Sequence, residues 1–191
     1  ATFTREYFVS HPDQIMAVKL SASRKDSLSF RVRFESELKY STSGQDHILR
    51  VDGYAPYHAE PDYRGNMPNA VRFDEDRGTR FSTYATLQTD GGQVAVSNGA
   101  LSVTGADEAI LYVSMATSFN GFDKDPAKEG LDNRAMASRQ LADASSLAYE
   151  QLKQRHLADY QAFFSRVELD LGETSAPDVP TDERLKRYTQ G

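Results

Sequence analysis

The sequence contains no cysteine, which excludes disulfide bonds, thiolate metal sites and cysteine nucleophiles within these residues. Histidine is scarce as well. The four histidines, His11, His47, His58 and His156, are scattered and show no metal-ligand spacing such as His-x-x-x-His, so a zinc site is not expected. The composition therefore favours a protein that works without a metal or another cofactor.

Blocks of basic residues and long apolar runs are also missing. Lys and Arg number 22 against 28 Asp and Glu, a net charge of −6. Nucleic-acid binding needs a concentrated patch of Lys and Arg to contact phosphates, and no apolar run approaches the length of a bilayer span. We expect neither a nucleic-acid partner nor a membrane partner.

Alternating apolar and polar residues dominate the first two thirds of the sequence. This pattern is typical of strands with one buried and one solvated face. It predicts strands over residues 3–9, 14–20, 28–34, 48–51 and 81–87.

Glycine-containing turns follow the last of these strands. Asn98-Gly99 between alternating runs is a strong hairpin signal, and Asp90-Gly91-Gly92 is interpreted as a second turn. Together they predict a three-strand meander over residues 81–87, 94–96 and 101–103.

Residues 109–116 are apolar on both parities. A strand of this kind is expected to be central and covered on both faces. With many strands at roughly ten-residue spacing and no βαβ rhythm, the fold class is predicted to be mainly β, an antiparallel sandwich.

Helix-forming residues follow from residue 132. We expect one or two helices between 132 and 165, with a break near Ser145-Ser146. Tyr149, Leu152, His156, Tyr160 and Phe163 recur at steps of three and four, which aligns them on one helix face.

The tail changes period again. Val167, Leu169 and Leu171 alternate with polar residues and predict a strand that ends at Gly172, and Thr181 begins a further helix. Because the sequence opens inside a strand pattern and stops soon after a helix start, we expect it to be a fragment.

The loop over residues 54–67 has the most functional character. It places Tyr57, His58, Glu60, Asp62 and Tyr63 between glycine and proline residues. Aromatic rings that stack on sugar C–H faces, together with charged groups that bond hydroxyls, suit carbohydrate recognition. The alternatives are a long loop pinned by its own Tyr and Pro side chains, or one that packs against a second domain.

The other carboxylates could form an acid–base pair, because glycoside hydrolysis uses two of them. Glu35 and Glu37 flank a turn, residues 74–76 form a charge run typical of a solvated face, and residues 123–125 lack the spacing of an EF-hand loop. None of these groups identifies a catalytic pair.

An ordered set of short motifs resembles one known family, glycoside hydrolase family 95, the α-L-fucosidase-type enzymes. The motifs that carry the resemblance cover residues 3–10, 12–18, 78–81, 116–122, 156–160, 164–172 and 180–185.

The resemblance implies an N-terminal antiparallel β-supersandwich, a helical linker and an (α/α)6 barrel that holds the active site. On this map residues 1–122 are the later part of the supersandwich, and residues 123–191 are the helical linker and the start of the catalytic barrel. The implied reaction is hydrolysis of terminal α-L-fucosides, typically α-1,2-linked, with inversion. Its general acid and water-positioning residues lie on the barrel, so no residue here inherits a catalytic role.

The resemblance also suggests where this chain meets its partners, which are the oligosaccharide substrate and its own catalytic barrel. His58 and Asp62 are the expected substrate contacts if the loop reaches the active site. The residues expected at the interface with the barrel are His156, Tyr160, Phe163 and Phe164. A secreted or periplasmic location is expected on the same ground.

Three other functions remain open from the sequence. An α-L-galactosidase of the same family is one, and a stand-alone carbohydrate-binding or structural β-module is another. A phosphorylase or glucoamylase-like enzyme shares the sandwich-plus-barrel plan, although the motif at residues 180–185 favours family 95.

Overall fold

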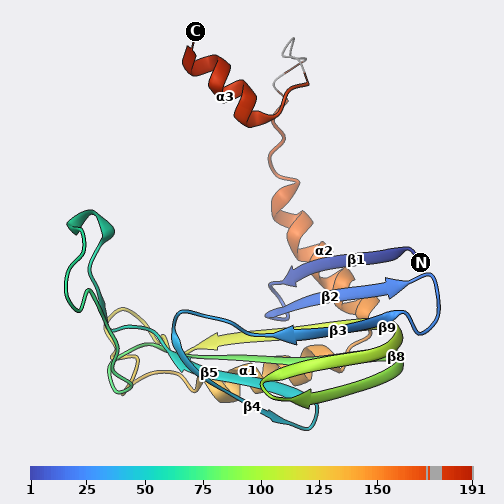
Figure 1. Cartoon of the computed structure of the whole chain (residues 1–191), viewed down its shortest axis with the longest axis horizontal. Coiled ribbons are helices and arrows are strands. Elements are labelled where there is room, and N and C mark those ends of the chain that lie inside the picture. The colour runs from blue at the N-terminus through green and yellow to red at the C-terminus, as the bar shows by residue number, and fades with distance from the viewer. Residues whose placement is uncertain (171, 173–177, 191) are drawn as a thin grey trace. The chain divides into compact units, whose positions relative to one another are not determined.

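A computed structural model describes residues 1–170, 172 and 178–190 (Figure 1). Contacts divide the chain into two compact units, Ala1–Asp159 and Tyr160–Gly191. In the part of the chain that the structure describes, no helix is both long and apolar enough to cross a membrane.

The described residues form nine strands, three α-helices and one short 3-10 helix, all named by their position along the chain. They are β1 (Phe3–Ser10), β2 (Ile15–Ala22), β3 (Leu28–Arg33), β4 (Lys39–Gln45), β5 (Ile48–Tyr54), β6 (His58–Ala59), η1 (Asp62–Arg64), β7 (Val71–Arg72), β8 (Arg80–Ser97), β9 (Ala100–Thr117), α1 (Asn133–Ser145), α2 (Tyr149–Phe164) and α3 (Thr181–Gln190).

A seven-stranded antiparallel sheet is the main feature of the first unit. Its order is β1-β2-β9-β8-β5-β4, and β3 also pairs with β9. Strand β9 pairs with β3 through residues 100–106 and with β2 through residues 108–114. The prediction of a mainly β, antiparallel fold followed by helices is confirmed.

The predicted three-strand meander is wrong. Strands β8 and β9 form one hairpin of 18 residues a side, joined by Asn98 and Gly99, both with positive φ. The pair Asp90-Gly91 marks a β-bulge, not a reversal. Glycine adopts positive φ in β-bulges as well as in turns. The glycines at 91 and 92 were therefore predicted to form a turn although they lie at a bulge.

The end of this hairpin folds back over β4. A Cβ atom at Gly44 would lie 2.2 Å from Cγ1 of Val96, and one at Gly99 would lie 2.8 Å from the Thr42 hydroxyl. This approach closes a core between the two halves of the bent sheet. Its buried residues are Leu28, Leu49, Val51, Ala85, Leu87, Leu101, Val103, Ala106 and Ala109.

Helices cover the opposite face of the sheet. Leu141 of α1 and Leu152 of α2 are buried in a second core with Tyr112 of β9, and the Ser114 hydroxyl donates to the carbonyl of Ala137 over 2.8 Å. Because Ala109 belongs to the first core and Tyr112 to the second, each with 0% exposure, β9 contributes to both cores as expected for a central strand. Near its end Met115 is 63% exposed, so the cover does not extend over the whole predicted stretch.

The two helices and the break between them are confirmed as well. The Asp132 carboxylate caps α1 by accepting from the Ala135 amide over 3.0 Å, which satisfies a backbone donor at the helix start. Helix α1 ends at Ser145 and α2 begins at Tyr149.

A polar and aromatic contact attaches α2 to the edge strand β1. The Tyr149 hydroxyl donates to Glu6 over 3.0 Å, and Lys153 donates to the same carboxylate. The hydrogen bond from Lys153 lowers the pKa of Glu6, whereas burial, followed by the bond to Glu6, raises the pKa of Tyr149. Phe8 and His156 stack alongside, with ring centroids 5.0 Å apart.

The strand predicted near residues 167–171 is not found. Residues 166–170 are not in a strand, Leu171 lies outside the described residues, and Val167 and Leu169 are exposed. A strand needs a paired neighbour to satisfy its backbone groups, and the alternating side chains alone do not supply one. Helix α3 does begin at Thr181 as predicted.

We expect Leu141→Ala to lower the free energy of unfolding by about 2–5 kcal/mol, because it leaves a cavity between α1 and the sheet. Urea denaturation followed by circular dichroism measures this change. The matched control is Leu185→Ala on α3, where the leucine is exposed. Its expected effect is within about 0.5 kcal/mol, and equal losses at the two sites would contradict the assigned packing.

Acid should weaken the contact between α2 and β1. The pKa of Glu6 lies below its ordinary value of 4.5 in the folded chain, so its stabilising effect is complete above that pH and is lost as the pH falls through the folded value. The Glu6→Gln variant should be less stable at neutral pH and lose less stability on acidification.

Chemical denaturation from about pH 6 to about pH 3 tests this expectation. Glu168→Gln, at an exposed position, is the control and should follow the wild type. Parallel stability profiles for wild type and Glu6→Gln would refute the assigned role of Glu6.

Candidate functional site

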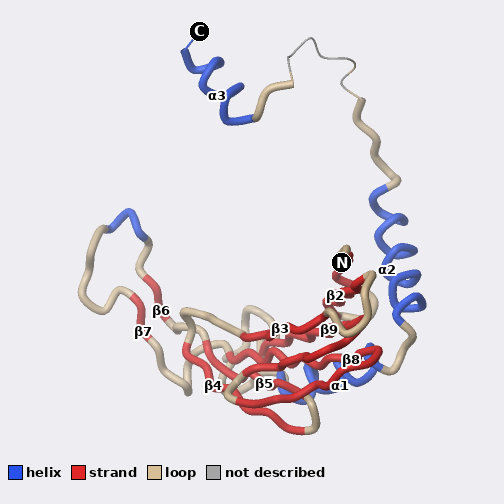
Figure 2. Tube along the Cα trace, turned by 45° about the vertical axis from the view of Figure 1, so that its right-hand side comes forward, coloured by secondary structure: helices blue, strands red, loops and turns tan. Residues whose placement is uncertain are grey.

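The segment between β5 and β8, residues 55–79, forms an arm that stands out from the sheet (Figure 2). Its base is closed by the Ala55 amide, which donates to the Thr79 carbonyl over 2.9 Å. Farther out, β6 and β7 pair as a separate two-stranded sheet. The functional loop predicted over residues 54–67 is therefore one side of a longer hairpin-like arm.

A chain of ionic hydrogen bonds orders the outer part of the arm. Nε2 of His58 lies 2.9 Å from Oε1 of Glu60, and Nη1 of Arg64 donates to Oε2 of the same carboxylate over 2.7 Å. These two bonds, that from His58 first, lower the pKa of Glu60. Glu60 is thus held ionised between His58 and Arg64. It orders the part of the arm in which the sequence predicts His58 and Asp62 as substrate contacts.

The two predicted substrate contacts lie in different settings. His58 is on β6 and is engaged by Glu60, whereas Asp62 begins the short helix η1 at the tip. Among the described residues, no hydrogen bond or ion pair joins their side chains. The tip also presents Tyr63, which is 89% exposed and is one of the aromatic residues that the sequence pattern suggests for stacking on sugars.

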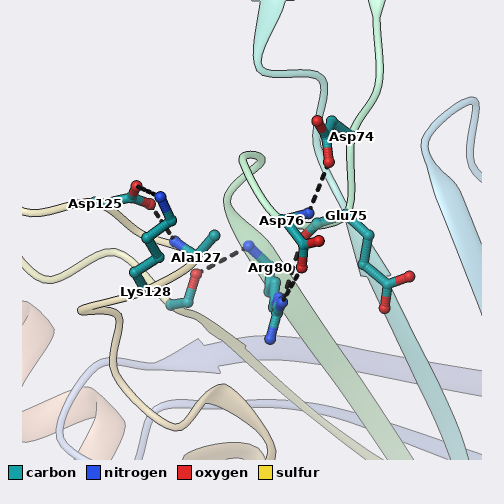
Figure 3. A network of polar contacts seen from close by, with 8 residues as sticks. Asp74, Glu75, Asp76, Arg80, Asp125, Ala127 and Lys128 are labelled. Carbon is teal, nitrogen blue, oxygen red and sulfur yellow. Dashed lines mark hydrogen bonds and ion pairs between the residues drawn. The ribbon is translucent and has the colours of Figure 1, made fainter.

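The base of the arm is fixed to the sheet through Arg80, the first residue of β8. Its backbone amide donates to the Ser118 hydroxyl over 2.9 Å, and its Nη2 donates to the Glu75 carbonyl over 3.3 Å. Figure 3 shows Arg80 between the acidic turn at residues 74–76 and the loop that carries Asp125 and Lys128. The acidic turn therefore supports the arm as well as facing solvent.

Aromatic contacts strengthen the same region. Arg77 lies 3.9 Å from the centroid of the Tyr57 ring, and Tyr54 packs edge-on against Phe73 at 6.2 Å. Cation–π and edge-to-face contacts each make a modest contribution to the stability of a folded segment. They agree with the interpretation that the arm is pinned in part by its own Tyr side chains.

The four residues predicted at a domain interface divide between the two units. His156, in the first unit, stacks on Phe8 of β1. In the second unit Tyr160 and Phe164 stack on one another at 5.0 Å, and Arg166 lies 4.6 Å from the Phe163 ring centroid. Tyr160, Phe163 and Phe164 are exposed, at 49%, 61% and 66%, and their assignment to an interface stays a prediction.

The chemistry available on the arm is binding chemistry. A carboxyl group whose pKa is lowered does not hold a proton near neutral pH, which is the opposite of what a general acid in glycoside hydrolysis requires. Glu60 therefore does not suit that role. The described residues also contain no group of three or more side chains placed to hold a metal ion.

Two family models match the chain in succession. Residues 1–121 match the model described as glycosyl hydrolase family 65, N-terminal domain, and residues 148–191 match the glycosyl hydrolase family 95 catalytic domain. The resemblance to family 95 that the motifs indicated is confirmed.

A curated relative and a solved structure are also similar. Alpha-L-fucosidase 2 of Arabidopsis thaliana is 31% identical over 198 residues, covering 97% of this chain and 23% of that protein. The chain thus spans about a quarter of the relative's length. A putative kojibiose phosphorylase from human microbiome aligns at 9% identity with a TM-score of 0.48, over 85% of this chain and 20% of that one.

We expect the Glu60 carboxyl to titrate below its ordinary value of 4.5, because two cationic or hydrogen-bonding partners stabilise its charged form. Replacing His58 or Arg64 by Gln should move the titration toward the ordinary value. Carbon-detected NMR of the side-chain carboxyl measures both shifts. An unchanged Glu60 titration in both variants would show that the ionic chain on the arm is not formed in solution.

Proposed function

The chain belongs to the family described as glycosyl hydrolase family 65, N-terminal domain, and its residues 148–191 match the family 95 catalytic domain. On this premise we propose that it is the non-catalytic portion of an α-L-fucosidase-type exo-glycosidase. The proposed reaction is inverting hydrolysis of terminal α-L-fucosides, with α-1,2 linkages preferred. The observation that carries the proposal is the 31% identity to alpha-L-fucosidase 2 along nearly the whole chain.

The geometry agrees with a supporting role for this portion. On the arm, the Glu60 carboxylate is ionised and engaged on both oxygens, by His58 and Arg64. This arrangement suits the orientation of binding side chains rather than proton transfer to a substrate. In this proposal the acid and the water-positioning groups belong to a catalytic barrel outside these residues.

The arm is proposed to approach the sugar bound by that barrel. Glu60 fixes the ring of His58, and η1 places Asp62 at the tip beside the exposed Tyr63. A carboxylate and an aromatic ring on a rigid support are suited to bond hydroxyls and to stack on a sugar face. His58 and Asp62 remain the residues assigned to substrate contact.

Helix α2 is proposed to connect the sheet domain with the barrel. His156, Tyr160, Phe163 and Phe164 are assigned to this junction. The exposed rings of the last three give it an apolar surface, and burying them against a partner would contribute about 1.5–3 kcal/mol for each ring.

Two alternatives differ in their consequences. An α-L-galactosidase would have the same arm and junction but prefer a sugar with one further hydroxyl. A stand-alone carbohydrate-binding module would need no barrel, and the exposed Tyr63 together with the two closed cores of the first unit are the observations in its favour. Export to the periplasm or the outside of the cell belongs to the main proposal and is tested by locating the full gene product.

The proposal predicts that the 191-residue chain alone does not hydrolyse 2′-fucosyllactose, and that the gene product extending into the barrel does. Release of L-fucose with its anomeric configuration read by NMR measures both activity and inversion. Turnover by the chain alone, or preferential turnover of the matching α-L-galactoside by the long form, would overturn the proposed assignment.

Variants of the arm refine the same test in the long form. His58→Ala and Asp62→Ala should each lower kcat/KM about tenfold or more, equivalent to losing about 1.4 kcal/mol of transition-state binding. His47→Ala in the β4–β5 turn and Asp143→Asn on α1 are matched controls at exposed positions. Unchanged hydrolysis in both arm variants would remove the arm from the substrate site.

A further inference from the structure

A cavity of about 780 Å³ lies at the base of the arm. Its walls come from the start of β4, the end of β5, the start of β8 and the loop that leads into α1. Cavities of about 300–1,000 Å³ are the usual size for small-ligand sites. This one lies apart from His58 and Asp62, which are not among its lining residues.

Three lining residues, Asp52, Asn133 and Arg134, are joined in a polar network through Ser82, a buried residue behind the lining. The Ser82 hydroxyl donates to Oδ1 of Asp52 over 2.5 Å and accepts from Nδ2 of Asn133 over 2.7 Å. Arg134 completes it, with Nε 3.3 Å from Oδ2 of Asp52. Because Ser82 and Asn133 are buried, this network is ordered before any ligand arrives, which reduces the entropic cost of binding.

One donor in the lining has no acceptor. Nε of Arg80 is buried and makes no hydrogen bond among the described residues, although the same side chain uses its Nη2 on the Glu75 carbonyl. A buried polar group without a partner is costly. Because Nε is covered by protein, a ligand in the cavity can reach Arg80 only through the rest of its guanidinium group, which is partly exposed.

The remaining lining residues define the class of ligand. Tyr40, Tyr54 and Phe81 supply aromatic surface, and the charged groups are of both signs, with Lys39 and Arg134 facing the same space as Asp52 and Glu75. Mixed charge disfavours a strongly anionic ligand, since it would meet carboxylates as well as cations. Aromatic surface with mixed donors and acceptors matches a neutral ring that carries hydroxyls.

We propose that this cavity is an accessory sugar-binding site, which takes one neutral hexose or deoxyhexose residue of an oligosaccharide without transforming it. The lining residues of the cavity indicate the class of ligand, a neutral sugar. The expectation that this sugar is fucose or galactose rests on the proposed function. Its location at the base of the arm allows a longer glycan to be held by this chain while its terminal sugar is bound elsewhere.

The test uses the 191-residue chain labelled with ¹⁵N and titrated with L-fucose, D-galactose and, as an anion probe, sodium sulfate. Saturable shifts are expected for at least one of the two sugars in the amides of Tyr40, Tyr54 and Asn133, with none for sulfate. Tyr40→Ala should weaken binding about three- to tenfold by removing an aromatic contact. The matched control is Tyr7→Ala, an exposed ring on β1 that does not line this cavity, and it should bind as the wild type does.

A second variant keeps the test decisive if Tyr40→Ala does not fold. Arg134→Gln changes a largely exposed side chain at the cavity and should also weaken sugar binding. Absence of saturable shifts with both sugars, shifts with sulfate only, or equal weakening by Tyr7→Ala would each overturn the site. The experiment measures sugar binding by this chain, so its result does not depend on the fucosidase activity of the longer gene product. An inactive long form would contradict the proposed function but not the accessory sugar site, and an active long form would not by itself support that site.

Discussion

The pairing of β9 with three other strands is the constraint on which the rest of this molecule depends. Over 18 residues it hydrogen-bonds with β8 on one side and with β3 and β2 in succession on the other. Because buried backbone groups must be paired, this one strand fixes the register of the sheet and of both cores. Ala109 faces the core of the bent sheet and Tyr112 the core under α1, so a shift by one residue would exchange these cores.

The proposed function is one of support and recognition, and the electrostatics of the described carboxylates agree with it. The carboxylates of Glu6, Asp52 and Glu60 are each engaged by hydrogen-bond donors or cations. Those of Glu6 and Asp52 join segments distant along the chain, whereas that of Glu60 orders its own arm. The lowered pKa values of Glu6 and Glu60 keep both carboxylates ionised near neutral pH, which does not suit proton donation to a glycosidic oxygen. The exposed aromatic rings on the arm and on α2 are the surfaces that the proposal assigns to partners.

Much of the fold could be predicted from periodicity, and the failures have physical causes. The strand at residues 109–116 and the break between α1 and α2 follow from side-chain patterns that burial imposes. Strand β4 was missed because every residue of it is exposed and largely polar, so no alternation marks it. At the candidate site the sequence predicts substrate contacts for His58 and Asp62, which stay predictions. The position of Glu60 between His58 and Arg64 depends on the geometry of the arm, which residue order does not reveal.

The close approach of Val96 to Gly44 places the end of the β8–β9 hairpin on the edge strand β4. Strand β4 is an edge with unpaired backbone groups on one side, and such edges can recruit strands from other chains. The hairpin end that folds over Gly44 bends this part of the sheet and stands against its face. Any larger side chain at position 44 would push Val96 away, so the hairpin end can stay seated on this edge strand only while that position is glycine.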